Sequence, residues 1–150
     1  MKLAFVWETA HPQHTALEKE FTAIAQKVLR DHNQQAVALD VVLVSDDRIR
    51  MYNKTYRGHD TATDVLSFAF SDSAPFPSPR EEKNLGQIII NLEDVSRTAR
   101  KRHVEEKDIA HFLFVHGLLH VLGYDHMKKG DEKKMRDAEK RYCGKQVWYQ

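Results

Sequence analysis

The sequence predicts an α+β fold in one domain, residues 1–150, in which a small, mostly four-stranded mixed sheet packs with about five helices. Three observations carry this prediction. Short runs rich in β-branched residues recur along the chain, stretches with apolar residues at helical spacing separate them, and the segment 105–122 is apolar almost all round. A chain of 150 residues can bury roughly two thirds of the surface that its unfolded form exposes. One core is therefore expected.

The first third of the chain reads as strand, helix, strand. Lys2–Glu8 is a short β-prone run and predicts the first strand. Thr15 and Glu18 have the spacing of a capping box, which predicts an amphipathic helix that ends at about Arg30. Ala36–Val44 is almost continuously apolar, a pattern typical of a strand that is covered on both faces. This strand is expected to be central.

The next helix leads to the first candidate site residue. Ser45 and Asp46 can cap it, and Gly58 marks its end. Its predicted apolar side consists of Ile49, Tyr52 and Tyr56. Arg57 is thus expected near a helix C-terminus, where the chain enters a loop. A cation there would stabilise the helix dipole whether or not it has a further role.

The middle of the chain supplies two more strands. Val65–Phe70 reads as a strand, and Ser71–Asn84, which holds three of the four prolines, reads as a surface loop. Gln87–Ile90 is the fourth predicted strand. Asn91 can cap the helix that follows, whose apolar side carries Val95 and Ala99.

Two helices complete the predicted fold. Glu105–Leu122 is apolar on nearly every side, as a central buried helix should be. Asp131–Cys143 is amphipathic and ends at Gly144. The inward residues of this last helix are predicted to be Met135, Ala138 and Tyr142.

The composition restricts the class of protein. Lys and Arg number 23 and Asp and Glu 22, so the overall charge gives no sign of a nucleic-acid partner, and any RNA surface must be local. The single cysteine, Cys143, argues against disulfides and fits a reducing cytosol. The longest uncharged run, Ile109–Tyr124, has 16 residues and is too short to span a membrane. No signal peptide is evident, and a monomer is expected.

The segment 116–126, HGLLHVLGYDH, has the spacing of a metal site. His116 and His120 lie four residues apart, so their rings point the same way on a helix. Gly123 can take a positive φ and end the helix, which lets His126 approach the same point. Three protein nitrogens leave a position for water, as in catalytic zinc sites. Zn²⁺ is the expected ion, although nickel and copper also bind such ligands.

The same histidine spacing occurs in the metzincin proteases, H-E-x-x-H-x-x-G-x-x-H. Those enzymes use the glutamate of that motif as general base, and this chain has Gly117 at the equivalent position. Glycine cannot accept a proton, so peptide hydrolysis by that mechanism is disfavoured. A metallopeptidase-like hydrolase remains an alternative on spacing alone.

The eleven residues 116–126 resemble the signature of the YbeY family, H-G-x-L-H-x-x-G-Y-D-H, at every specified position. The block 53–68, NKTYRGHDTATDVLSF, is similar to the family's N-x-x-Y-R-x-x-D-x-x-T-D-V-L-S-F and aligns Arg57 with its functional arginine. A third block, 85–95, resembles L-G-D-I-x-I-s-x-E but carries Gln87 where the family usually has Asp. The resemblance extends weakly to Met135 and Glu139 and covers about residues 45–140.

This resemblance implies a metal-dependent, single-strand-specific endoribonuclease of ribosomal RNA (16S 3′ end) maturation and ribosome quality control. It also implies a cytoplasmic location, with the small ribosomal subunit, its proteins and a ribosome-assembly GTPase as partners. Arg57 would neutralise charge on the phosphate, because a guanidinium offers a planar fork to its oxygens. The motif has no evident general base, so the nucleophile is either metal-activated water or the ribose 2′-hydroxyl.

Three roles stay open at this stage. Asp125 either hydrogen-bonds the turn or orients a ligand imidazole, and Asp64 either caps a strand or forms a polar wall of the site. A non-catalytic ribosome-assembly factor with a structural metal is the remaining alternative for the whole protein.

Overall fold

The computed structural model describes residues 1–70, 83–125 and 129–143. These residues form the predicted α+β fold, with a four-stranded mixed sheet and five helices. Along the chain, the elements are β1 (Lys2–Trp7), α1 (His14–Asp31), β2 (Val37–Val44), α2 (Asp46–Arg57), β3 (Val65–Ala69), β4 (Lys83–Asn91), α3 (Leu92–Arg102), α4 (Glu106–Val121) and α5 (Lys129–Cys143).

The sheet has the strand order β1-β2-β4-β3. β1, β2 and β4 run parallel, and β3 runs antiparallel to β4, with Val65 opposite Ile90 and Ala69 opposite Gly86. β2 is an inner strand, buried on both faces as its sequence predicted. Of the described strands, β1 and β3 lie at the edges. β3, the antiparallel edge strand that follows α2, lies beside α4.

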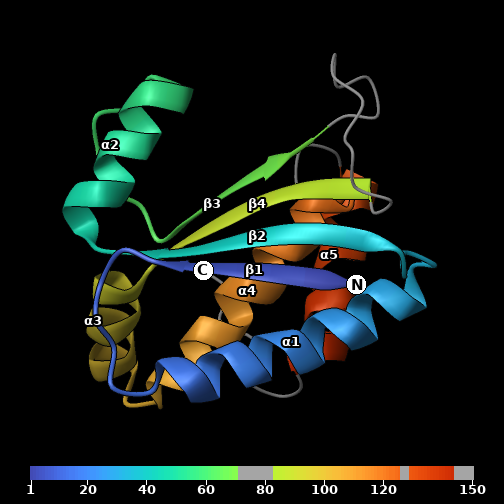
Figure 1. Cartoon of the computed structure of the whole chain (residues 1–150), viewed down its shortest axis with the longest axis horizontal. Helices are drawn as coiled ribbons and strands as arrows, with labels where there is room; N and C mark the ends of the chain where they lie inside the picture. The colour runs from blue at the N-terminus through green and yellow to red at the C-terminus, as the bar shows by residue number, and fades with distance from the viewer. Residues whose placement is uncertain (71–82, 126–128, 144–150) are drawn as a thin grey trace.

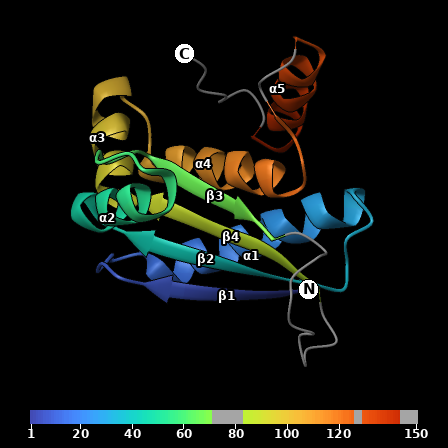
Figure 2. The ribbon, with the colours of Figure 1, turned by 90° about the horizontal axis from the view of Figure 1, so that it is seen from above.

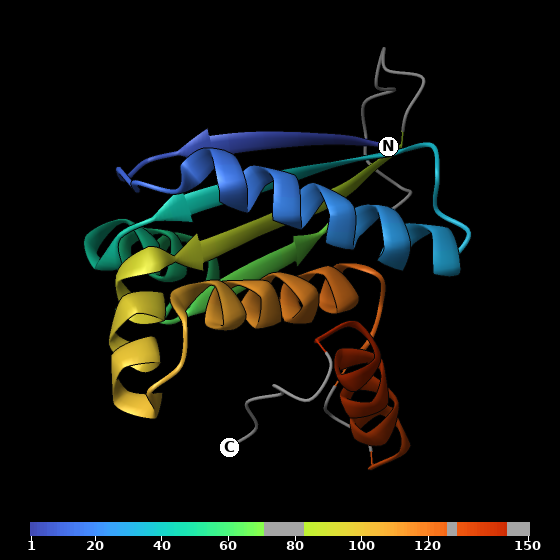
Figure 3. The ribbon, with the colours of Figure 1, turned by 90° about the horizontal axis from the view of Figure 1, so that it is seen from below.

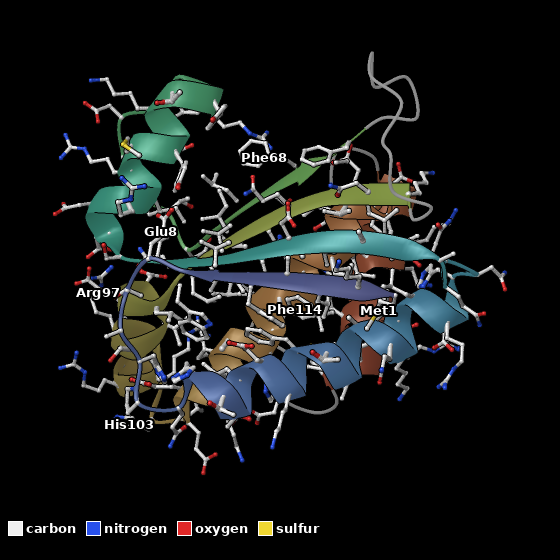
Figure 4. All side chains as sticks on the ribbon, in the orientation of Figure 1. Met1, Glu8, Phe68, Arg97, His103 and Phe114 are labelled. Atoms are coloured by element: carbon white, nitrogen blue, oxygen red, sulfur yellow. The ribbon has the colours of Figure 1, made fainter. Side chains whose placement is uncertain are left out.

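Helices cover the two faces of the sheet unequally, as Figure 1 shows. On one face, α1 and α4 cross beneath the strands, and their side chains share the larger core with Ile88, Ile90 and Val41. On the other face, α2 packs through Ile49 on a smaller cluster around Ile89. Figure 4 shows Phe114 on the side of α1 and Phe68 on the side of α2.

The larger core forms around α4. Phe114 is fully buried and its ring stacks on Phe21 of α1, with 4.6 Å between ring centroids. Burying one such side chain stabilises the fold by about 1.5–3 kcal/mol. Figure 3 shows α4 between α1 and the C-terminal helix, with α3 near its beginning and α5 near its end. The central buried helix that the sequence predicts is confirmed, and none of the described helices is long and apolar enough to cross a bilayer.

Two of the predicted helix caps need correction. α1 begins one residue before Thr15, and within the described residues no side chain caps it. Glu18 does not close a capping box, because its carboxylate accepts a hydrogen bond from the Trp7 indole at 2.8 Å. Ser45 stands at the N-cap of α2 as predicted, but its side chain makes no capping bond among the described residues. At Glu18, the hydrogen bond from Trp7 of β1 thus replaces the local capping bond.

The Asn91 cap is confirmed. Its side-chain oxygen accepts hydrogen bonds from the backbone N–H groups of Glu93 and Asp94. The side-chain nitrogen of Asn91 donates to Asp46 at 2.7 Å, and the guanidinium of Arg97 holds the same carboxylate through two bonds of 2.7 Å. Arg97 and Asn91, in that order, lower the pKa of Asp46 to about 2. These bonds connect α2 to α3.

The remaining boundaries differ little from those predicted. β4 begins at Lys83, earlier than the predicted Gln87, while most of the loop predicted for Ser71–Asn84 lies outside the described residues. Gly58 ends α2 with φ 73°, as expected. Gly86 allows β4 to approach β3, since a Cβ there would lie 2.0 Å from the carbonyl oxygen of Phe68. The end of the last helix, predicted at Gly144, is also outside the described part.

Candidate functional site

A cleft of about 550 Å³ lies between the edge strand β3, the end of α4 and the turn that follows α4. Figure 2 shows α4 running alongside β3. The residues that line the cleft come from three separate parts of the chain: Arg57, Val65, Leu66, Ser67, Ala69, His116, His120, Gly123, Tyr124 and Asp125. Three of the four residues that the sequence singles out for chemistry thus line one cleft.

His116 and His120 stand one turn apart on α4, and their ring centroids are 4.7 Å apart. The Nδ1 atom of His120 lies 3.0 Å from the backbone oxygen of Tyr124, and that of His116 lies 3.2 Å from the carboxylate of Glu139. Because a carbonyl oxygen can only accept, Nδ1 of His120 carries the proton and Nε2 carries the lone pair. An ionised Glu139 imposes the same tautomer on His116. This arrangement is typical of metal-binding histidines.

His126, the third predicted ligand, lies outside the described residues. In the ranges that the structure covers, no three His, Cys, Asp or Glu side chains gather as a metal site. The turn that leads toward His126 is described, and Gly123 has φ 106°, as the sequence predicted. Side chains with a Cβ rarely adopt this conformation, so glycine is needed where the chain leaves α4.

Glu139 is a site residue that the sequence reasoning did not assign. It lies on α5, is almost wholly buried and contacts His116. Its position provided a signal, because it continues the helical spacing of Met135, Ala138 and Tyr142 on the inward side of α5. A carboxylate on a buried helix face requires a polar partner, and few such partners were available in this core.

Tyr124 connects the turn after α4 to the end of α1. Its hydroxyl lies 2.7 Å from Nε2 of His32, and Nδ1 of His32 lies 2.7 Å from the backbone oxygen of Val28. Since Nδ1 must donate to that oxygen, Nε2 accepts a hydrogen bond from the Tyr124 hydroxyl. The same residue, Tyr124, presents its carbonyl to His120. His32, which follows the end of α1, therefore helps to fix the turn.

Arg57 reaches the cleft from the end of α2. Its Nη2 atom donates to the backbone oxygen of Ser67 at 2.7 Å, and its guanidinium carbon lies 4.8 Å from the ring centroid of Phe68. One hydrogen bond and one aromatic ring therefore orient the plane of the guanidinium. The remaining N–H groups give Arg57 the means to bind an anion in the cleft.

The comparisons with known proteins identify the family. The family model for endoribonuclease YbeY matches residues 6–146. Two proteins named endoribonuclease YbeY, from Pelotomaculum thermopropionicum and Roseiflexus castenholzii, are 37% and 39% identical over 131 and 125 residues. These alignments cover 87% and 81% of this chain, and 86% and 78% of the two relatives. This chain belongs to the YbeY endoribonuclease family.

The match to the YbeY family model extends beyond the motifs to α1 and the last two residues of β1. A structural comparison agrees on the fold: the solution structure of a Thermotoga maritima protein superposes with a TM-score of 0.66, at 24% identity, and covers 97% of this chain and 89% of that protein. The predicted resemblance is therefore confirmed.

The structure also shows where Gly117 lies, the residue that this chain has in place of the metzincin glutamate. A Cβ on Gly117 would point toward the sheet and lie 2.8 Å from the Cγ2 atom of Ile88. A glutamate at this position would be directed into the core, away from the cleft between His116 and Arg57. The metzincin general base thus has no room in this fold, and the metallopeptidase alternative loses its geometric support.

Three further residues that the sequence analysis named lie at different distances from the chemistry: one lines the cleft, one caps a strand and one lies on the other face of the sheet. Asp125 lines the cleft, next to the turn. Asp64 caps the start of β3, because its carboxylate accepts the backbone N–H of Val65 at 2.7 Å. Gln87 alternates with the inward Ile88 and belongs to the sheet face that α2 covers, so the difference from the usual YbeY aspartate lies on the opposite face from His116.

Proposed function

We propose that this protein is a single-strand-specific, metal-dependent endoribonuclease that acts in maturation of the 16S ribosomal RNA 3′ end and in ribosome quality control. The observation that carries the proposal is the shared cleft of Arg57, His116 and His120 in a chain of the YbeY family. The Arg57 guanidinium thus shares a cleft with two imidazoles whose Nδ1 atoms hydrogen-bond Glu139 and the Tyr124 carbonyl. Family membership and the cleft geometry support the same chemistry independently.

The metal is proposed to be one Zn²⁺ ion held by His116, His120 and His126. The hydrogen bonds that Glu139 and the Tyr124 carbonyl make with the two Nδ1 atoms support this assignment, because they leave both Nε2 atoms as the metal-binding nitrogens. When bound, the ion would supply Lewis acidity, lowering the pKa of water and polarising a phosphoryl oxygen.

Arg57 is proposed to neutralise the charge that develops on the scissile phosphate. Its anchorage to Ser67 and Phe68 supports this role, since a preorganised cation stabilises a transition state without first having to reorganise. Glu139 and Tyr124 act as positioning residues for the histidines. The nucleophile is either water or the ribose 2′-hydroxyl.

The cellular setting is proposed from the family motifs. The protein would act in the cytoplasm as a monomer on the small ribosomal subunit, together with subunit proteins and a ribosome-assembly GTPase. The relatives are named endoribonucleases, which supports RNA as the substrate class. A non-catalytic assembly factor would make the same contacts without cutting RNA.

The deciding experiment is a time course on a fluorescent single-stranded RNA and its duplex, with the zinc content of every preparation measured. Wild type should cut the single strand, while zinc-replete Arg57→Ala and zinc-depleted His120→Ala should not. The matched control is Arg50→Ala, because Arg50 lies on the same helix and pairs with Asp60 instead of the cleft. Arg50→Ala should cut like wild type.

The products identify the nucleophile. A 2′,3′-cyclic phosphate end would assign the attack to the ribose hydroxyl, and a linear phosphate released without a cyclic intermediate would assign it to water. Equal cutting by all variants would trace the activity to a contaminant. If wild type cuts neither free RNA nor small subunits, the endoribonuclease proposal is wrong.

A further inference from the structure

Tyr56 is the most exposed large hydrophobic residue of the described chain, at 66%. It lies in the last turn of α2, directly before Arg57. The sequence predicted Tyr56 on the apolar side of the helix with Ile49 and Tyr52, but only Ile49 is fully buried. This prediction is wrong for Tyr56, because its ring meets Phe68 of β3 only edge-on and most of its surface stays exposed. One exposed hydrophobic side chain is ordinary on a protein surface, but this ring lies directly next to Arg57, which lines the cleft.

Tyr56 and Arg57 share one support, the ring of Phe68. The Tyr56 ring meets it edge-on, with 5.7 Å between centroids, and the Arg57 guanidinium carbon lies 4.8 Å from the same centroid. On its other side, Tyr56 stacks on Tyr52 at 6.4 Å with 17° between the ring planes. Figure 4 shows Phe68 between α2 and β3. The ring of Tyr56 is therefore braced, while most of its surface stays exposed.

Arg57 joins this aromatic group to the cleft. It hydrogen-bonds the backbone of Ser67, a cleft residue, and covers Phe68, which points to the other side of β3. A polynucleotide whose phosphate lies on Arg57 would thus bring a neighbouring base to Tyr56. Bases stack on exposed aromatic rings in proteins that bind single strands, and one such base contributes roughly 5- to 150-fold in affinity.

We propose that Tyr56, braced by Phe68 and Tyr52, forms a stacking platform for one unpaired base of the RNA, next to the phosphate on Arg57. The proposal rests on the endoribonuclease function and adds a source of strand selectivity to it. In a duplex, each base is already stacked between its neighbours and cannot offer a face to Tyr56. A single strand gains the contact without first unpairing.

The test measures the affinity of a short single-stranded RNA and of its duplex by fluorescence anisotropy, in chelator so that no cutting occurs. Tyr56→Ala should weaken single-strand binding by roughly 5- to 150-fold and change duplex binding by less than about 2-fold. Tyr56→Phe should bind like wild type, and Tyr56→Leu should bind like Tyr56→Ala. Met51→Ala is the matched control, because Met51 is also exposed on α2 but makes no ring contact with Phe68 in the described structure; it should bind like wild type.

A set of RNAs, each with one abasic site, completes the test. At one position, removal of the base should weaken binding to wild type as much as Tyr56→Ala does, and should cause no further loss in that variant. Three results would overturn the platform. Tyr56→Ala could bind both RNAs with wild-type affinity, its affinity for the single strand and the duplex could fall by the same factor, or each abasic site could weaken its binding as much as it weakens that of wild type. In those cases wild type still cuts RNA through Arg57, and the proposed function stands. If wild type neither binds nor cuts RNA, both proposals are wrong.

Discussion

Gly117 sets how closely α4 approaches the sheet, and this closeness can be tested by adding one carbon atom. In Gly117→Ala, the new Cβ would lie 2.8 Å from Cγ2 of Ile88, a methyl on the branched Cβ of a fully buried side chain with little freedom to move aside. Overpacking of this kind costs about 1–3 kcal/mol, against which alanine gains about 1 kcal/mol in helix propensity. We expect a net loss of up to about 2 kcal/mol in the free energy of unfolding.

At about 2–4 °C per kcal/mol for a chain of this size, the melting temperature of Gly117→Ala should fall by up to about 8 °C. Calorimetry and urea unfolding, both in chelator, measure the effect without any contribution from metal. Ile88→Ala supplies the control: alone it costs about 2–5 kcal/mol, because Ile88 is fully buried, but it removes the clashing methyl.

On the Ile88→Ala background, Gly117→Ala should become neutral or stabilise the protein by up to about 1 kcal/mol. The sign of the substitution therefore depends on Ile88. An equal loss on both backgrounds would refute the reasoning, since the cost would then arise elsewhere than at the contact between α4 and β4.

Three other substitutions probe the site and the fold. Glu139→Gln should weaken Zn²⁺ binding by about 10-fold or more, measured by competition with a chromophoric chelator, because the amide orients His116 without adding charge; unchanged affinity would contradict a positioning role. Tyr124→Phe removes a 2.7 Å bond and should cost about 1 kcal/mol in urea unfolding, and no loss would contradict the connection to α1. Asp46 has a folded pKa of about 2, below its ordinary 3.8, so it favours the folded state at higher pH and loses this contribution as pH falls through about 4 to about 2. The difference in melting temperature between wild type and Asp46→Asn should shrink over that range, and a constant difference would contradict it.

Local pattern predicted most of the elements because it reports which residues avoid water. The continuous apolar run of β2 indicated an inner strand, and the all-round apolar sequence of α4 indicated a central helix; both are confirmed. Helix ends were less predictable where a side chain had a stronger distant partner. Glu18 binds the Trp7 indole instead of closing a cap, a choice that depends on how β1 and α1 meet.

The site was only partly predictable for the same reason. The spacing of His116 and His120 follows from helix geometry, so local sequence suffices to bring them together. The approach of Arg57 to them requires β3 to pair at the edge beside β4, and the order of strands is set by contacts between residues far apart in sequence. The exposure of Tyr56 depends on neighbours that the helical period does not reveal. The period places Glu139 on the inward side of α5, but its contact with His116 depends on how α5 packs on α4.

The hydrogen bond from Arg57 to Ser67 also bears on how the protein stays separate from other copies of itself. Residues 64 and 70 of the β3 segment bond to β4, and with the alternation of an antiparallel pair this turns the Ser67 carbonyl toward the open side of the described sheet. An open strand edge invites pairing with another chain, and a charged side chain across it prevents this. Arg57→Ala should therefore self-associate at high concentration in light scattering, so its hydrolysis is best compared with wild type in dilute solution.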